Sequence, residues 1–183
     1  MNFSKQTVRD IDVDRQVVLV RVDYNVPLKK DGSIDDDLRI RASLPTIKYL
    51  IERQCKLGLM SHLGRPEGRD QSQSLAPVAA RLSELLGQSV KFIDDCIGDK
   101  VYQTVKHAPG GSVILLENLR YYPQEEADDM EFAKNIAKST GANLFVQDGF
   151  GAAHRAHAST HAITQFLPSF AGLLLEKEVT MIN

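Results

Sequence analysis

The chain has 183 residues, of which 43% are hydrophobic and 25% are charged, and its formal net charge at pH 7 is −2. This length is enough for one domain with a complete core, and the composition is ordinary for a globular protein. The slightly negative charge argues against a general nucleic-acid binder. No apolar run approaches the roughly 20 residues of a membrane span, and no secretory signal follows Met1. We therefore expect a cytoplasmic protein that binds neither nucleic acid nor membrane.

Short apolar runs alternate along the chain with segments in which apolar residues recur every three or four positions. In chain order, the runs predict strands at Val17–Val22, Lys56–Met60, Val90–Ile93, Val113–Leu116 and Leu144–Val146, with a shorter one at Ala171–Leu174. The periodic segments predict helices at Arg39–Arg53, Ala76–Leu86, Asp99–His107 and Met130–Ser139. This alternation predicts an α/β fold with a doubly wound, mainly parallel sheet and helices on both faces, a Rossmann-like three-layer sandwich.

Residues with strong local preferences refine the ends of the helices. Ser74 is a candidate N-cap, and Gly87 a candidate C-terminal residue, of the second predicted helix. Pro45 lies inside the first helix and is tolerated if that helix begins near Ala42, so that the proline falls in its first turn. Residues 173–183 have the pattern of a helix that starts and then stops without a cap, which indicates a chain cut from a longer one.

Polar side chains follow four of the predicted strands. Parallel strands lie about 4.8 Å apart, their carboxyl ends meet at one edge of the sheet, and ligands of open α/β sheets bind at that edge. Arginine is suited to two-point contacts with carboxylate and phosphate groups. The sequence therefore predicts one positively charged pocket for a small ligand with several negative charges, such as a carboxylate and a phosphate. The candidate residues are Arg21, Asp23, Asn25, Arg39, His62, Arg65, Arg120 and Arg155.

Other polar clusters have simpler interpretations. A single arginine at a strand end is usually solvated or ion-paired, so the predicted pocket depends on the whole set. His157 and His161 have the spacing of a metal-binding pair, but no acidic or cysteine partner lies nearby at ligand spacing. They are better explained as residues at the start of a helix. We expect a solvated turn at Asp35–Asp37, the acidic start of a helix at Glu125–Asp129, and no metal site.

Four segments, taken together, resemble the signature segments of phosphoglycerate kinases. They are Arg21–Pro27, Ser61–Pro66, Glu117–Arg120 and Asp148–His157, and their order and spacing agree with that family from about residue 17 to residue 179. The resemblance implies the family's N-terminal domain, which would bind 3-phosphoglycerate, or 1,3-bisphosphoglycerate in the reverse direction. This domain would occupy residues 1–173, and residues 174–183 would be the truncated start of the helix that joins it to a second domain.

The resemblance also implies a role for each candidate residue other than Arg21. Asp23 and Asn25 would orient the hydroxyl and carboxyl end of the substrate. Arg39 would be catalytic, because it would stabilise the charge of the phosphoryl group during transfer. The remaining basic residues would bind the substrate, with the 3-phosphate held mainly by the arginines; they are His62, Arg65, Arg120 and Arg155.

Three residues depart from the family pattern, namely Gln147, Gly149 and Ala152. Gly149 is expected to loosen its loop, and Ala152 to remove a hydroxyl group. None of the three changes removes an anion-binding side chain. We therefore expect a modest loss of substrate affinity and unchanged chemistry.

The resemblance covers only one of the family's two domains. The second domain would bind Mg-ADP or Mg-ATP and supply a lysine for phosphoryl transfer, so we expect no nucleotide cofactor on this chain. The resemblance implies a monomer that folds, binds 3-phosphoglycerate weakly and shows no turnover. The alternative is a stand-alone or non-catalytic anion-binding module. A nicotinamide-linked Rossmann protein is disfavoured, because no glycine fingerprint follows the first strand.

Overall fold

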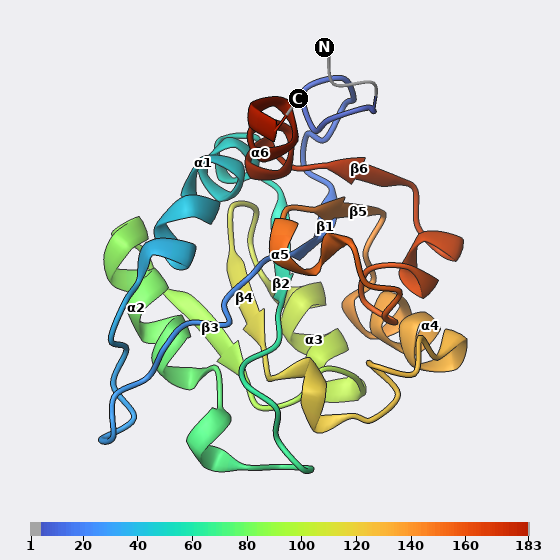
Figure 1. Ribbon diagram of the computed structural model, residues 1–183. Helices are drawn as coiled ribbons and strands as arrows, with labels where there is room; N and C mark the ends of the chain where they lie inside the picture. The colour runs from blue at the N-terminus through green and yellow to red at the C-terminus, as the bar shows by residue number, and fades with distance from the viewer. Residues whose placement is uncertain (1–4, 183) are drawn as a thin grey trace.

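The computed structural model describes residues 5–182, and its central feature is a six-stranded sheet (Figure 1). The order of the strands across the sheet is β3-β4-β2-β1-β5-β6, and every neighbouring pair is parallel. The predicted α/β class with a parallel sheet is confirmed. The strands are β1 (Val17–Arg21), β2 (Lys56–Met60), β3 (Val90–Ile93), β4 (Val113–Leu116), β5 (Leu144–Gln147) and β6 (Ser169–Ala171).

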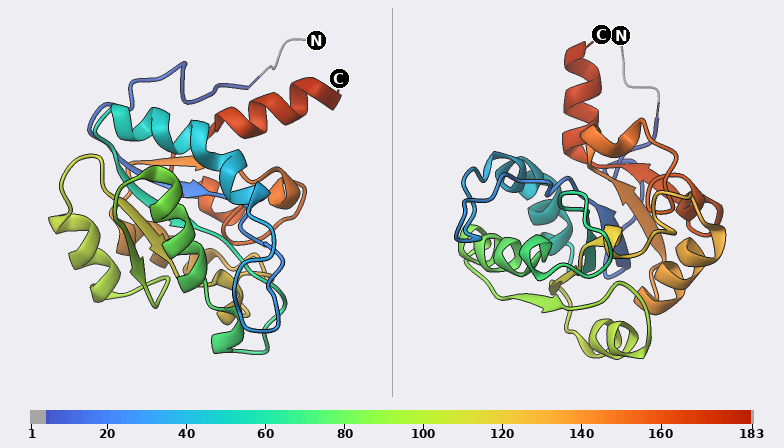
Figure 2. Two further views of the ribbon diagram at one scale, coloured as in Figure 1. Left: turned by 90° about the vertical axis from the view of Figure 1, so that its left-hand side faces the viewer. Right: turned by 60° about the horizontal axis from the view of Figure 1, so that its bottom comes forward.

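Helices cover both faces of the sheet (Figure 2). On β1, Val18 and Val20 belong to the core beneath α1 and α2, whereas Leu19 belongs to the core beneath α3 and α4. A strand buried on both faces needs a continuous apolar run, as β1 has. No helix in the described part of the chain is long and apolar enough to cross a membrane. The helices are α1 (Leu38–Glu52), α2 (Ala76–Leu86), α3 (Asp99–His107), α4 (Met130–Thr140), the short α5 (Phe150–Ala153) and α6 (Leu173–Ile182), with 3₁₀ turns at Gln71–Gln73, Leu119–Tyr121 and Ala162–Gln165.

The first helix agrees with the predicted range Arg39–Arg53 to within one residue at each end, but the condition under which Pro45 was expected to be tolerated does not hold. α1 starts at Leu38 rather than near Ala42, and Pro45 lies in its middle. The proline lacks the N–H that would bond the carbonyl of Arg41. Both residues lie on the exposed side of the helix, where water can bind that carbonyl. Burial of the apolar stripe on the opposite side outweighs the missing hydrogen bond.

The last predicted strand is wrong in its position. β6 ends at Ala171, and α6 begins at Leu173. The helix predicted from residue 173 is confirmed, whereas the strand predicted at Ala171–Leu174 extends too far, into that helix, because a short apolar run does not reveal whether its period is that of a strand or of a helix. The structure fixes the start of α6 through the buried Asp148, whose Oδ1 accepts a hydrogen bond from the Leu174 N–H at 3.0 Å. Gly172 permits this contact, because a Cβ there would lie 2.0 Å from the same oxygen.

The start of α2 also differs from the prediction. The N-cap is Leu75 rather than Ser74, whereas Gly87 ends the helix in the left-handed conformation, with φ of 67°, as expected. The Ser74 hydroxyl donates to Glu117 at 2.7 Å, and Glu117 also accepts from the Leu75 N–H at 2.9 Å. A carboxylate at the end of β4 thus takes part of the capping role that the sequence assigned to the local serine.

Candidate functional site

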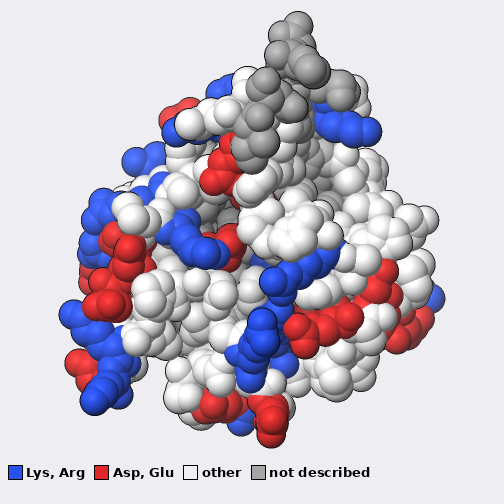
Figure 3. Space-filling view, viewed as in Figure 1, with Lys and Arg blue, Asp and Glu red and all other residues white. Residues whose placement is uncertain are grey.

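The loops that were predicted to meet do meet at one edge of the sheet. β1 lies between β2 and β5, with Arg21 opposite both Met60 and Gln147, and β4 lies beside β2. The chain winds outward from β1 in two directions, and such switch points are where α/β sheets bind ligands. Figure 3 shows Lys and Arg side chains gathered beside and below the position of α5, with acidic side chains around them. The predicted edge therefore has a local excess of positive charge.

Three of the predicted arginines form a positively charged cluster. Arg65 and Arg155 are exposed, whereas Arg120 is buried. Burial lowers the pKa of Arg120, and the charges of Arg155 and Arg65 lower it further against the opposing effect of Glu126, so the three guanidinium groups interact. Arg120 is fixed by a hydrogen bond to the carbonyl of Gly64 at 2.6 Å and by an ion pair with Glu126 at 2.9 Å. The cluster thus has one fixed and two exposed guanidinium groups.

His62 lies beside this cluster and is uncharged at neutral pH. The residue is only 8% exposed, and Nη2 of Arg21 lies 2.8 Å from its Nδ1. Burial, together with the positive charges of Arg21, Arg120 and Arg155, lowers the pKa of His62 to about 2. His62 therefore contributes a polar ring to the site rather than another positive charge.

Arg39, Asp23 and Asn25 form a second part of the site. Arg39 makes an ion pair with Asp23, and both side chains line a cavity of about 260 Å³ together with Leu174 of α6. Asn25 links the two parts, because its Oδ1 accepts from the N–H of Gly64 at 2.8 Å and its own N–H donates to Asp23 at 3.2 Å. The predicted set is thus divided into an arginine cluster and an Arg39–Asp23 pair, with Asn25 bound to the loops of both.

Gly149 is held by a close contact, in contrast to the predicted loosening of its loop. Its φ is −94°, which any residue can adopt. A Cβ there would lie 3.1 Å from the carbonyl carbon of Val22 and 3.3 Å from the nitrogen of Asp23. At Gly151, a Cβ would lie 2.5 Å from Oδ2 of Asp23. The two glycines therefore let the loop after β5 lie directly against the loop after β1.

Arg21, which the sequence analysis placed among the pocket residues, lies instead behind His62 in a buried polar group, whose other two members the sequence analysis missed. Arg21 is fully buried, and its Nε donates to the hydroxyl of Ser159 at 2.8 Å. Ser159 in turn donates to Glu125 at 2.5 Å. Glu125 is 0% exposed, so the predicted acidic helix start is wrong for this residue. It holds for Asp129, which caps α4 by accepting from a backbone N–H at 2.7 Å.

The two histidines spaced four apart have separate partners. Nδ1 of His161 lies 2.6 Å from Asp128, directly before a 3₁₀ turn, and Nδ1 of His157 lies 3.8 Å from Glu125. Within residues 5–182, no group of three or more His, Cys, Asp or Glu side chains could hold a metal ion. The expectation of no metal site stays a prediction.

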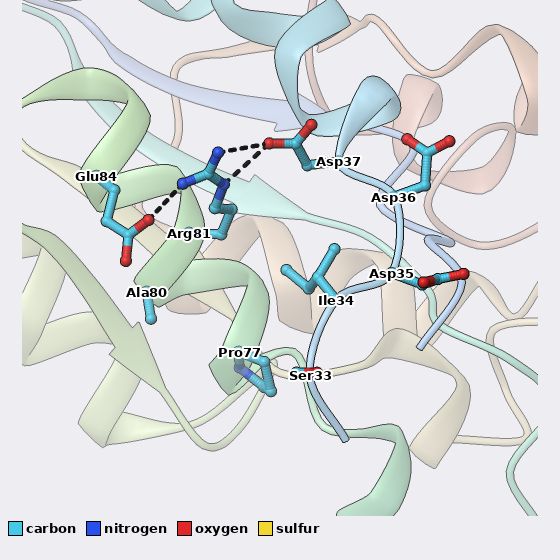
Figure 4. A pocket seen from close by; sticks show the side chains of 9 residues that line it. All are labelled: Ser33, Ile34, Asp35, Asp36, Asp37, Pro77, Ala80, Arg81 and Glu84. Carbon is cyan, nitrogen blue, oxygen red and sulfur yellow. Dashed lines mark hydrogen bonds and ion pairs between the residues drawn. The ribbon is translucent and has the colours of Figure 1, made fainter. Parts of the chain in front are cut away.

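An acidic cavity between residues 33–37 and α2 lies apart from this site (Figure 4). It has a volume of about 750 Å³. Asp37, which was predicted to be a solvated turn residue, instead accepts from Arg41 at 2.8 Å and from Arg81 at 2.9 Å. Arg81 also pairs with Glu84 at 2.5 Å. The arginine of this cavity is therefore already neutralised, and the cavity is unsuited to an anion.

The fold and the site together define a class of protein, a parallel α/β domain with arginine side chains clustered at the carboxyl ends of its strands. The model of the phosphoglycerate kinase family matches residues 8–183. The phosphoglycerate kinase of Dictyoglomus turgidum is 53% identical over 184 residues, which cover 99% of this chain and 46% of that protein. The phosphoglycerate kinase of Aquifex aeolicus is 52% identical over 179 residues, covering 97% of this chain and 45% of that protein.

Solved structures agree with these sequence matches. Phosphoglycerate kinase from Coxiella burnetii superposes with a TM-score of 0.85 at 36% identity, over 97% of this chain and 44% of that one. The enzyme from Pyrococcus horikoshii superposes with a TM-score of 0.87 at 35% identity, over 96% of this chain and 44% of that one. The chain therefore belongs to the phosphoglycerate kinase family, which confirms the resemblance drawn from its four segments. It spans about half the length of the curated relatives it matches.

Proposed function

We propose that this chain forms the substrate-binding half of a phosphoglycerate kinase and binds 3-phosphoglycerate or 1,3-bisphosphoglycerate. The observation that supports this most is the cluster of Arg65, Arg120 and Arg155, which come from three different loops. The cluster concentrates positive charge in a chain whose net charge is −2. A phosphate group bound there would accept several charge-assisted hydrogen bonds, which are about twice as strong as neutral ones.

The Arg39–Asp23 pair would receive the other end of the substrate. Asp23 and Asn25 would orient the hydroxyl and carboxyl groups, and Arg39 would stabilise the phosphoryl group during transfer. The side chain of Arg39 is 51% exposed. Ion pairs this exposed contribute at most about 1 kcal/mol, so Arg39 can leave Asp23 for a ligand at little cost.

The family's reaction passes a phosphoryl group between 1,3-bisphosphoglycerate and ADP, giving 3-phosphoglycerate and ATP. The Mg-nucleotide would be bound by a second domain and brought to the substrate by hinge closure, which excludes water. This chain would supply the substrate site and one cation for the transition state. We therefore expect binding by the 183-residue chain without turnover.

Calorimetric titration of the 183-residue chain with 3-phosphoglycerate tests the proposed function. We expect saturable binding that Arg65→Ala and Arg155→Ala each weaken about tenfold or more, because each removes a hydrogen bond between charged groups. Arg53→Ala is the matched control, since it removes the same charge at the far end of α1, where Arg53 stacks on Tyr49. Its affinity should equal that of the wild-type chain.

Two results would contradict the proposed function. One is the absence of binding by the wild-type chain. The other is an affinity that both arginine variants leave unchanged. The same samples, supplied with Mg-ATP and 3-phosphoglycerate, should form no ADP, and measurable ADP formation would show that the chain needs no second domain.

A further inference from the structure

Arg21 is the centre of a hydrogen-bonded chain that ends at His62. Its Nε donates to the hydroxyl of Ser159 at 2.8 Å, its Nη2 lies 2.8 Å from Nδ1 of His62, and its Nη1 donates to the carbonyl of Val22. A guanidinium group can only donate hydrogen bonds. Nδ1 of His62 must therefore be the acceptor, and it carries no proton.

The other end of this chain has an equally fixed polarity. The hydroxyl of Ser159 accepts from Arg21, so its own proton points to Oε1 of Glu125, 2.5 Å away. Oε2 of Glu125 accepts from the Ser159 N–H at 3.1 Å. Glu125 and Ser159 are both 0% exposed. Since no water reaches the carboxylate, nearby positive charge must balance it, and the fully buried Arg21 supplies much of that charge.

We propose that Glu125, Ser159 and Arg21 are positioning residues that hold His62 as a neutral imidazole with its single N–H on Nε2, ready to donate to 3-phosphoglycerate. We call these three residues the Arg21 relay. Within residues 5–182, Nε2 of His62 has no hydrogen-bond partner and is not sealed from solvent, so it is open to a ligand. The identity of the ligand rests on the proposed function, whereas the assignment of the His62 tautomer does not.

An uncharged His62 suits this position better than a charged one, because several arginines already lie nearby. A proton on Nδ1 would face an N–H of Arg21 across 2.8 Å, beside the positive charges of Arg120 and Arg155. A ring whose tautomer is fixed before binding needs no reorganisation when the anion arrives. Through the relay, the buried carboxylate of Glu125 thus helps to fix the N–H of His62 on Nε2, where it faces the anion site.

Nitrogen-15 NMR of the His62 ring in the 183-residue chain tests the relay, because the chemical shifts show which ring nitrogen carries the proton. At neutral pH we expect an unprotonated Nδ1 and a protonated Nε2, with and without 3-phosphoglycerate. Ser159→Ala removes the link between Arg21 and Glu125, so that the guanidinium group of Arg21 can turn toward the carboxylate and away from Nδ1 of His62. We expect it to give a mixture of tautomers and about tenfold weaker binding of 3-phosphoglycerate, the loss of one hydrogen bond to a charged group.

Ser74→Ala is the matched control, because it removes another buried serine–glutamate hydrogen bond, that of Ser74 to Glu117 at 2.7 Å. It should keep the wild-type tautomer. If Ser159→Ala does not fold, Glu125→Gln takes its place, since it keeps the size of the side chain but removes the charge that balances Arg21.

A protonated Nδ1 in the wild-type chain would overturn the relay. So would a Ser159→Ala chain, or in its place a Glu125→Gln chain, in which both the tautomer and the affinity are unchanged. Because the tautomer is read without ligand, the relay and the proposed function fail separately. A wild-type chain with the expected tautomer but no affinity for 3-phosphoglycerate would support the relay and overturn the proposed function.

Discussion

Replacing Arg21 with methionine is expected to lower the free energy of unfolding by about 3–5 kcal/mol, the usual cost of removing one partner from a buried charge pair. Methionine keeps much of the length of the side chain, so the loss comes mainly from the groups that remain. Glu125 would keep a carboxylate that is 0% exposed, without the charge that balances it. The hydroxyl of Ser159 and Nδ1 of His62 would each lose a donor. Urea denaturation measures the change.

The double variant Arg21→Met/Glu125→Gln separates the effect of charge from that of packing. Glutamine removes the negative charge but keeps an oxygen that can accept from the Ser159 N–H. We expect the double variant to be more stable than Arg21→Met alone, because no uncompensated charge stays buried. A double variant that is as unstable as the single one, or less stable, would show that Arg21 does not balance Glu125.

The ionisation of Asp148 is expected to weaken folding by about 3 kcal/mol as the pH rises from about 4 to about 6. Burial raises the pKa of Asp148 to about 6, from the ordinary value of 3.8. Between these two values the folded chain holds a proton that the unfolded chain has lost. A rise in pH therefore favours unfolding over this range. The loss is absent below the ordinary pKa and complete above the raised one.

Asp148→Asn isolates this effect in denaturation experiments across the same pH range. Asp37 and Asp70 have lowered pKa values, so their ionisation favours folding as the pH rises. The stability of the wild-type chain therefore reports the sum of these opposing effects. Asparagine cannot ionise, but its oxygen can still accept from the Leu174 N–H at the start of α6. The stability difference between the two chains should shift in favour of the variant as the pH rises. A difference that stays constant would mean that Asp148 ionises as readily in the folded chain as in the unfolded one.

Helices and strands that have a typical boundary residue at one end are the part of the fold that the sequence predicts best. Ala76–Leu86, Asp99–His107 and Val113–Leu116 agree with the structure residue by residue, and each has a glycine or a charged residue directly beyond one of its ends. The apolar run around residues 170–175 has no such boundary residue apart from Gly172. The sequence predicts the helix from residue 173 but not the end of the strand before it, because the boundary between β6 and α6 depends on a contact with Asp148 from a distant loop.

The exposed half of the candidate site was predictable, and the buried half was not. The arginines follow strands, and parallel strands end at one edge whatever their order, so local patterns place these side chains together. Glu125 stands among other acidic residues and resembles a solvated helix start. Its burial depends on Ser159, 34 positions further along the chain. No local pattern links the two residues, because the contact is made only when the loop after β5 folds over the site.

The most direct test of the proposed site is a crystal structure of the chain with 3-phosphoglycerate bound. We predict phosphate oxygens within hydrogen-bond distance of the guanidinium groups of Arg65, Arg120 and Arg155, and a carboxylate that points toward Arg39. A phosphate seated elsewhere would contradict this, as in the cavity that Tyr102 lines between α3 and α4. So would a bound ligand that touches none of the three arginines.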